Sequence, residues 1–426
     1  MIYFLNPHYA DFYGTSVFNA LTGRFSHRKY WFISRYILEK PEKGVGILIN
    51  LRQNSFALAF VYKIPFLNRL VTLFELAAWF MINRINPFKI PVRFSAASLT
   101  KDDIVFIFAF DNLQRPANLI KEISGSPCVK VAHLTHYFLH TSQISRHAEK
   151  ISKLFFAAES NLSKYPYFKE YFPFYKKDAY LLPFIPQPRF TRRTPFSERR
   201  RKCLALGTLT LLSRTPETRD FMDFFHADCI HPMRRAIYEN RDRVAQFIDS
   251  GVNLYNTDAP VKDVHSQQQA VKKVYYGLWN LFKSRRKTYF SFSAADRFNQ
   301  YAMVVIPEEI NNLPGVSWVE SMACGSAYIG LDDPMYTDLG LTPGKHYIAY
   351  DNTLQGLLDV VKYYQRNPDA LERIAENGWK FVSERLNGPR AASLFLSDLR
   401  NLAAQAAAKI PPERMTFHSS FTKAER

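Results

Sequence analysis

The sequence predicts an α/β protein with two doubly wound, Rossmann-like domains that face a central cleft. Its 426 residues, 47% of them apolar, exceed what one ordinary hydrophobic core holds and suit two domains. Short apolar runs alternate with helical stretches, which is the pattern of sheets covered by helices on both faces. A proline-rich segment separates two such series. Ligands of open α/β sheets bind outside the carboxyl ends of the strands, so this architecture suits an enzyme with two substrates.

Five apolar runs in the first half of the chain predict the strands of the first domain. The clearest is Ile104–Phe110, an unbroken apolar run with KDD before it and DN after it. Runs that are apolar on both faces are typical of buried parallel strands. The other four are Ile2–Leu5, Gly46–Leu51, Val129–His133 and Leu154–Ala158.

The character of the sequence changes at residues 173–202, where five prolines lie among basic residues. Proline at this density sustains neither helices nor central strands, so we expect a linker. Beyond it we expect strands at Lys202–Leu206, Tyr289–Phe292, Met303–Ile306 and Ala327–Leu331, with a helix beginning in Trp318–Cys324. The expected units are a first domain (1–182), a basic linker (183–202), a second domain (203–390), and a C-terminal helix with a frayed polar tail (391–426).

The net charge of +18 indicates an anionic partner or a strongly solvated surface. From Arg189 to Lys202 there are seven basic residues and one acid, and Lys283–Lys287 forms a second basic cluster. Such patches attract nucleic acid, anionic lipid headgroups or phosphorylated metabolites. A solvated linker without any partner is the alternative interpretation.

The cysteines and the N-terminal sequence favour a cytoplasmic protein. The four Cys residues stand far apart with no CxxC pair, which argues against a disulfide framework or a zinc knuckle. The opening MIYFLNPHYADFY has no basic segment before an apolar one, so we expect no signal peptide.

The best candidate for a membrane segment is Val71–Ile82, which is interrupted by Glu75 and flanked by Arg69 and Arg84. A spanning helix needs about 20 apolar residues, so this stretch is too short. It is either an ordinary buried helix or an interfacial helix that dips into a bilayer.

The segment from Val304 to Leu331 contains the strongest candidates for ligand-binding residues. A strand ends at Pro307, a polar loop follows, and Pro314-Gly315 opens a helix. The N–H groups of Gly315, Val316 and Ser317 would then form an anion site at the helix start, suited to a diphosphate. Glu320, one turn further in, can accept hydrogen bonds from ribose hydroxyls. The alternative is an ordinary crossover in which this Glu caps the helix or pairs with an Arg.

The stretch PGVSWVESMACGSAYIG (Pro314–Gly330) resembles the C-terminal domain of GT-B glycosyltransferases, especially the group 1 and CgeB-like families. The following GKHYIAYDNTLQGLLDVVKYYQRNPDALERIAENGWKFVSERLN agrees with that pattern, and the resemblance covers about residues 289–390. It implies a GT-B fold.

The resemblance also implies roles for residues of the second domain. Glu320 matches the second Glu of the family's E-x7-E motif, which contacts the nucleotide ribose, whereas Asn312 stands where the first Glu belongs. The motif is therefore broken, which leaves retention or inversion of configuration open. Glu308 and Glu309 lie close by, and we take Glu309 as a catalytic candidate.

Further positions follow from the same resemblance. Gly207 and Thr208 match the glycine turn under the phosphates, and Arg214 is the expected cationic side chain nearby. No DxD triplet occurs in the sequence, so we expect charge neutralisation by this Arg, with no metal and no cofactor besides the donor substrate.

In the first domain, PCVKVAHLTHYFLH resembles the family's strand ending in His, which implies that His133 faces the cleft as an acceptor base. Tyr13, Gly14, Thr15 and His136 are expected on the acceptor side. The spacing of His133, His136 and His140 also fits a metal-binding helix face or ordinary packing.

These expectations combine into a metal-independent, hexosyltransferase-like enzyme that moves a sugar from a nucleotide sugar to a glycan or lipid-linked saccharide. It would act in cell-surface polysaccharide synthesis at the inner face of the cell membrane, attached to anionic lipid. The alternatives are a GT-B-type nucleotide-sugar epimerase and a basic nucleic-acid-binding protein. The latter lacks any RNP, KH, homeodomain or zinc-finger signature, so we expect no nucleic-acid partner.

Overall fold

The computed structural model describes residues 1–7, 32–39, 41–49, 64–82, 85–108, 119–135, 137–254 and 293–422. Several predicted features lie outside the described residues: Tyr13, Gly14, Thr15, His136, the basic cluster Lys283–Lys287 and the strand Tyr289–Phe292.

The first domain is built on a parallel sheet whose seven described strands have the order β3-β2-β1-β4-β5-β6-β7. Their bounds are β1 Ile2–Leu5, β2 Val45–Leu48, β3 Val92–Arg93, β4 Ile104–Phe108, β5 Val129–His133, β6 Leu154–Ala158 and β7 Tyr180–Leu181. The predictions for β1, β5 and β6 are confirmed residue by residue. These strands are buried along their whole length, as the apolar runs of β1 and β6 predict, and in β5 the burial includes Lys130, whose ammonium donates to the carbonyl of Ser126.

The second domain holds a parallel sheet with the described order β12-β11-β10-β8-β9. Its strands are β8 Arg200–Leu209, β9 Ile248–Leu254, β10 Tyr301–Val305, β11 Ala327–Leu331 and β12 Ile348–Tyr350. Strand β11 was predicted with these bounds. In both sheets the strand order reverses beside the first strand of the domain, so the prediction of two doubly wound α/β domains is confirmed.

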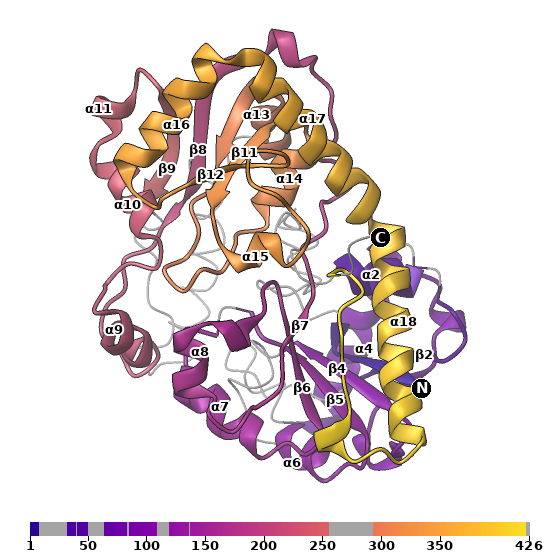
Figure 1. Ribbon diagram of the computed structural model, residues 1–426. Coiled ribbons are helices and arrows are strands. Elements are labelled where there is room, and N and C mark those ends of the chain that lie inside the picture. Colours follow the sequence, from indigo (N-terminus) through magenta and orange to yellow (C-terminus); the bar gives the residue numbers. More distant parts are fainter. Residues whose placement is uncertain are drawn as a thin grey trace.

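Helices cover both sheets (Figure 1). Those of the first domain are α2 Phe32–Glu39, α4 Pro65–Ile82, α6 Leu119–Ser124, α7 Thr141–Glu149 and α8 Pro166–Tyr171. The helices after β8 in the chain are α9 Arg219–Phe225, α10 Pro232–Glu239, α11 Arg241–Val244, α13 Ala294–Gln300, α14 Ser317–Ala323, α15 Pro334–Thr337, α16 Leu354–Arg366, α17 Pro368–Arg385 and α18 Gly388–Ala407. Helices α13 and α17 both contact α14, and α10 contacts α16, so the second sheet carries two helical layers.

The C-terminal region returns to the first domain, and the prediction of a frayed tail is wrong as far as Thr422. Helix α18 lies along the first domain against α2 (Figure 1). Beyond it, the ring of Phe417 stacks on Tyr180 of β7 with centroids 4.1 Å apart, and Ser419 donates a hydrogen bond to the carbonyl of Leu181. Phe421 is also buried. The polar appearance of this tail hid two apolar side chains that complete the core of the first domain.

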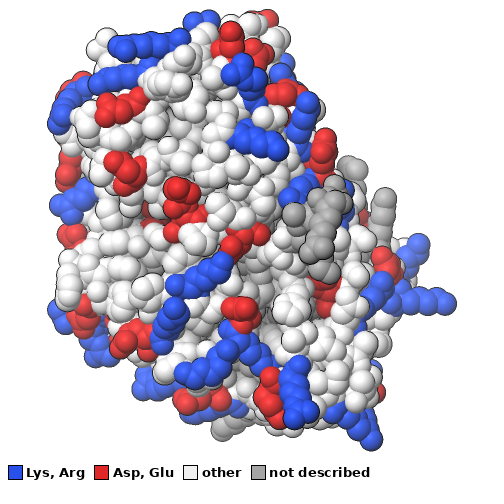
Figure 2. Space-filling view, viewed as in Figure 1, with Lys and Arg blue, Asp and Glu red and all other residues white. Residues whose placement is uncertain are grey.

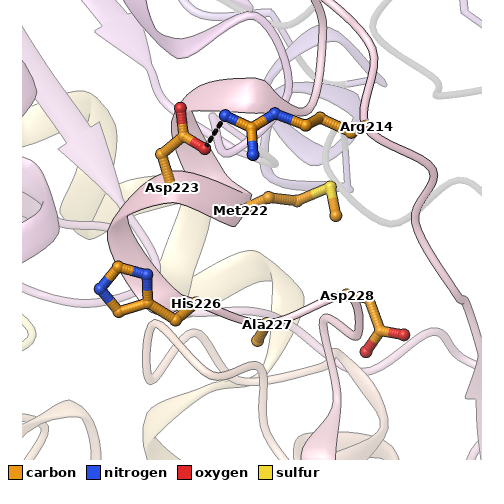
Figure 3. Close-up of a pocket in the computed structure, with 6 residues that line it drawn as sticks. All are labelled: Arg214, Met222, Asp223, His226, Ala227 and Asp228. Atoms are coloured by element: carbon orange, nitrogen blue, oxygen red, sulfur yellow. Dashed lines mark ion pairs between the residues drawn. The ribbon is translucent and has the colours of Figure 1, made fainter.

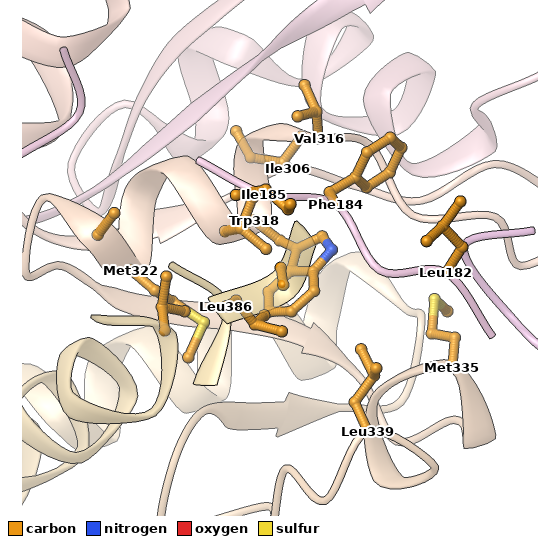
Figure 4. Close-up of a cluster of buried hydrophobic side chains, with 14 of the residues drawn as sticks. Leu182, Phe184, Ile185, Ile306, Val316, Trp318, Met322, Met335, Leu339 and Leu386 are labelled. Atoms are coloured by element: carbon orange, nitrogen blue, oxygen red, sulfur yellow. The ribbon is translucent and has the colours of Figure 1, made fainter. Parts of the chain in front are cut away.

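The linker between the domains is packed against the protein and is not a solvated spacer. Phe184 and Ile185 are buried in the apolar cluster that includes Trp318 of α14, and Ile185 lies next to this tryptophan (Figure 4). Strand β8 begins at Arg200, so the last residues of the predicted linker already belong to the second sheet.

Most charges of the basic cluster Arg189–Lys202 are engaged within the protein. The guanidinium of Arg199 is buried and donates to the carbonyls of Thr194 and Cys324. Ion pairs also engage Arg192 with Glu376, Arg193 with Asp296, and both Arg200 and Lys202 with Asp249. Lys and Arg alternate with Asp and Glu across the face seen in Figure 2. The cluster therefore presents a weaker field to an anion than its sequence suggests.

Candidate functional site

The candidate site is centred on the loop that follows β10. This loop leaves the carboxyl end of the second sheet and packs against the first domain. The N–H of Ile310 donates to the carbonyl of Ile230, just before α10. Leu313 is buried in the apolar cluster that includes Leu134 and Phe138 of the first domain. The predicted site residues on this loop therefore lie at the contact between the domains.

A buried arginine, Arg234 of α10, lies where three segments of the second domain converge. Its Nε donates to the carbonyl of Pro307 at 3.0 Å, and its Nη1 donates to the carbonyl of Thr208 at 3.1 Å. A Cβ on Gly207 would stand 2.7 Å from its Nε, so only glycine permits this approach. The Nη2 atom faces Gly315, at 3.6 Å from where a Cβ would be. Arg234 thus brings a positive charge to the predicted phosphate site.

The predicted cation Arg214 lies in a different setting. Its guanidinium forms an ion pair with Asp223 of α9 at 2.6 Å, at the edge of a pocket of about 540 Å³ (Figure 3). Asp228, another residue of this pocket, pairs with Arg235. Asp223 and Asp228 therefore neutralise the positive charges of Arg214 and Arg235, which an anionic ligand would need.

The start of α14 agrees with the predicted helix, which runs from Ser317 to Ala323. The first N–H groups of a helix have no partner within it, so an anion site at Gly315, Val316 and Ser317 stays a prediction, with Gly315 two residues before the first residue of α14. Glu320 is buried, with 4% of its surface exposed, and its Oε2 accepts a hydrogen bond from Ser317 Oγ at 3.1 Å. This contact also fits the alternative in which Glu320 caps its own helix.

Glu308 belongs to the core of the second domain. Its Oε1 accepts hydrogen bonds from the hydroxyls of Tyr328 and Tyr336 and from the N–H of Leu331. Complete burial raises the pKa of Glu308, although these three donors oppose the rise. Glu308 is therefore not the side chain that substitutes for the missing Glu of the motif.

The next loop residues lie at the domain contact. Glu309 is 9% exposed and its charge raises the pKa of Tyr137 in the first domain, after the larger effect of burial. Asn311 is buried, and its side-chain amide makes no hydrogen bond to a described residue. Asn312, in place of the motif's first Glu, has φ +59° and donates to Asp333 at 2.7 Å. Its amide thus supports the loop.

Across the contact, His133 ends β5 and Glu159 follows β6. The Nε2 atom of His133 is 3.4 Å from Oε1 of Glu159, and both side chains are almost fully buried. The register of the parallel strands explains this pairing, because His133 lies opposite Ala157. A carboxylate beside an imidazole favours the protonated ring, as a proton-accepting histidine requires.

Contacts between the domains hold these groups together. The hydroxyl of Tyr165 donates to Asp333 at 2.6 Å, and Lys164 pairs with Asp338. On the other side, α9 reaches the first domain, where the Asp220 carboxylate accepts from the N–H of Ser142. Asp333 thus binds both Tyr165 of the first domain and Asn312 of the second.

Sequence patterns predicted no role for Arg234, Glu159 or Asp333. Arg234 lies in the first turn of α10, in the sequence HPMRR, and α9 separates this helix from the Gly207 turn, so no local pattern links the two. Glu159 directly follows a predicted strand. Within the described residues, no group of three His, Cys, Asp or Glu side chains is arranged to hold a metal ion.

Comparisons with known proteins find similar structures only. No family model matches the chain, and no curated protein matches it. HepE of Anabaena in complex with UDP is 13% identical, with 93% of this chain and 99% of that chain covered and a TM-score of 0.47. A glycosyltransferase from Rickettsia africae is 9% identical (95% and 98% covered, TM-score 0.45), as is sucrose-phosphate synthase of Thermosynechococcus elongatus (95% and 99%, TM-score 0.46). Likenesses at these values establish no ligand or reaction for this chain.

Proposed function

We propose that this protein is a glycosyltransferase that moves a sugar from a nucleotide-sugar donor to a glycan or lipid-linked saccharide. The observation that carries the proposal is the position of Arg234, whose buried guanidinium meets the Gly207 turn and the Gly315 loop. A fixed cation beside free helix N–H groups suits the diphosphate of a nucleotide sugar.

The chemistry of the proposed reaction explains why a cation is needed there. Sugar transfer leaves a nucleoside diphosphate, so negative charge grows on the phosphate oxygens as the glycosidic bond breaks. A preorganised guanidinium stabilises this charge without having to reorient. Arg234 in this role makes the reaction independent of a metal ion, and Gly207 is the residue that allows the approach.

The first domain supplies the acceptor side in this proposal. His133 would take the proton of the acceptor hydroxyl, and Glu159 would stabilise the imidazolium that forms. Glu309 reaches the contact from the second domain, where it would act on the donor sugar. Tyr13, Gly14, Thr15 and His136 remain the proposed acceptor contacts.

We further propose that the enzyme works in polysaccharide synthesis at the inner face of the cell membrane, with a lipid-linked acceptor. The charge of +18 supports attachment to anionic lipid.

The test is a binding panel of UDP-, GDP-, ADP- and CMP-sugars on the full chain. One of them is expected to raise the melting temperature, because a ligand at 100 times its Kd stabilises by about 2.7 kcal/mol. Arg234→Gln should weaken that binding by about 10- to 100-fold, the loss of a charged hydrogen-bonding partner.

Arg235→Gln is the matched control, because Arg235 is the next residue on α10 but its side chain is exposed and paired with Glu239. Binding unchanged in a folded Arg234→Gln variant, or no binding of any donor, would refute the proposal. A new sugar formed from the donor without any acceptor would identify an epimerase instead.

A further inference from the structure

Exposed apolar side chains are concentrated in one short part of the chain. Eleven large apolar residues are exposed among the described residues, and eight of them lie between residues 64 and 94. They are Ile64, Phe66, Leu70, Leu73, Phe74, Met81, Phe88 and Phe94. Phe66, Phe74 and Met81 are 69%, 63% and 74% exposed. Apolar patches on this scale are unusual on a protein without a partner at that surface.

Helix α4 has both buried and exposed side chains among those that the structure describes. Leu76 and Phe80 are buried in the core of the first domain, so one side of the helix is fixed to the protein. The exposed positions 66, 70, 73, 74, 77 and 81 follow the helical repeat and lie together on the outward side. We call these six positions the α4 outer face. An ordinary buried helix, one of the two interpretations of Val71–Ile82, is therefore wrong.

Basic residues outnumber acids in the segment that contains this apolar face. The segment from Lys63 to Lys101 contains six Lys or Arg residues and one acid, Glu75. Arg69 is exposed on α4 itself, and its guanidinium lies over the ring of Phe94, with 5.6 Å between Cζ and the ring centroid. An outward apolar face with cations beside it matches the boundary between acyl chains and anionic headgroups.

We infer that the α4 outer face docks the protein on an anionic lipid bilayer, with Phe66, Phe74 and Met81 inserted among the acyl chains. No helix in the described part of the chain is long and apolar enough to cross a membrane, so α4 would lie in the plane of the interface. The inference deepens the membrane attachment proposed above and rests on it, but it does not depend on sugar transfer. It places the attachment on α4 and not on Arg189–Lys202, whose charges are largely paired.

A site-specific probe tests this docking. Cys128, Cys203, Cys229 and Cys324 are all buried, so a cysteine introduced at the surface can be labelled selectively with an environment-sensitive dye. The label in Phe74→Cys should shift to the blue when vesicles of phosphatidylcholine and phosphatidylglycerol are added. The label in Tyr363→Cys should not shift, because Tyr363 is similarly exposed, at 58%, but lies on α16 of the second domain.

Co-sedimentation with the same vesicles gives the strength of binding. The double variant Phe66→Ser/Phe74→Ser should bind at least tenfold more weakly, whereas Leu211→Ser, another exposed apolar position, should bind normally. Vesicles of phosphatidylcholine alone, or high salt, should weaken binding of the unaltered protein.

Two outcomes would overturn the inference. One is vesicle binding that the Phe66→Ser/Phe74→Ser variant retains in full. The other is a dimer in light scattering that this variant abolishes, which would assign the face to a second copy of the chain. The melting-temperature shift given by the nucleotide sugar reports the donor site separately, so either proposal can fail without the other.

Discussion

His133 Nε2 lies 3.4 Å from Glu159 Oε1, with the two residues at the ends of neighbouring parallel strands in the first domain. The strand register determines this distance. Strands β5 and β6 are paired as far as His133 and Ala157, so Glu159, the first residue after β6, can reach the imidazole. A carboxylate there fixes the ring and stabilises its charged form.

The first prediction concerns catalysis by this pair. In a transfer assay His133→Gln should lower kcat by about 10²- to 10⁴-fold, the usual contribution of a general base, with donor binding unchanged. Glu159→Gln should lower kcat less and leave the KM for the donor unchanged, because the imidazolium loses its anionic neighbour while the base itself remains. An unchanged kcat in Glu159→Gln would leave Glu159 a structural role only.

Glu308 provides a second prediction, on stability and pH. Burial raises its pKa in the folded state, so the folded protein binds a proton that the unfolded chain releases above about pH 4.3. Stability therefore declines as the pH rises from the unfolded pKa toward the folded one, and is flat above it. Glu308→Gln should remove this decline.

The check is the melting temperature of both proteins at several pH values from about 4.5 to 8. The melting temperature of Glu308→Gln, relative to that of the unaltered protein, should increase as the pH rises. A difference that stays constant with pH would mean that the pKa of Glu308 is not raised. Gln retains an acceptor for Tyr328 and Tyr336, so the packing of the two hydroxyls is preserved.

The sequence predicts those parts of the structure whose determining residues are consecutive in the chain. Strands β6 and β11 follow from their uninterrupted apolar runs, because burial on both faces of a sheet favours apolar residues at every position. Strand β9 (IDSGVNL) was not predicted because it lies at the edge of its sheet, where Asp249 and Asn253 can stay partly exposed.

The same distinction separates the site residues that could be predicted from those that could not. The α14 start was predictable because its glycine, helix and acid are consecutive in the chain. Arg234 was not, since its role depends on two carbonyls, Thr208 and Pro307, from distant segments. The exposure of α4 was equally hidden, because a helix apolar all round usually indicates complete burial.

A third prediction concerns the C-terminal tail. Phe417 is 8% exposed and stacks on Tyr180, so Phe417→Ala should destabilise the protein by about 3 kcal/mol, the lower end for removal of a buried aromatic ring. His418→Ala, at an exposed neighbouring position, should leave the melting temperature unchanged. Equal stability of the two variants in urea unfolding would show that the tail adds nothing to the core.

The last prediction decides the role of Glu320. Its carboxylate is buried and its Oε2 accepts a hydrogen bond from Ser317, so both a ribose contact and a cap for α14 are consistent with its position. As a ribose ligand, Glu320→Ala should weaken donor-nucleotide binding by about 10- to 100-fold, since hydrogen bonds to a charged group contribute about 1.5–3 kcal/mol.

Ser317→Ala separates this role from capping, because it removes the hydroxyl bound to Glu320 while the carboxylate remains. A cap predicts that both variants melt earlier by similar amounts and bind nucleotide normally once folded. A ribose contact predicts that Glu320→Ala alone loses affinity, by calorimetric titration with the donor found in the panel. Normal affinity in a folded Glu320→Ala protein would exclude the ribose contact and leave Arg234, with the loop at Gly315, as the remaining support for a nucleotide at this end of the sheet.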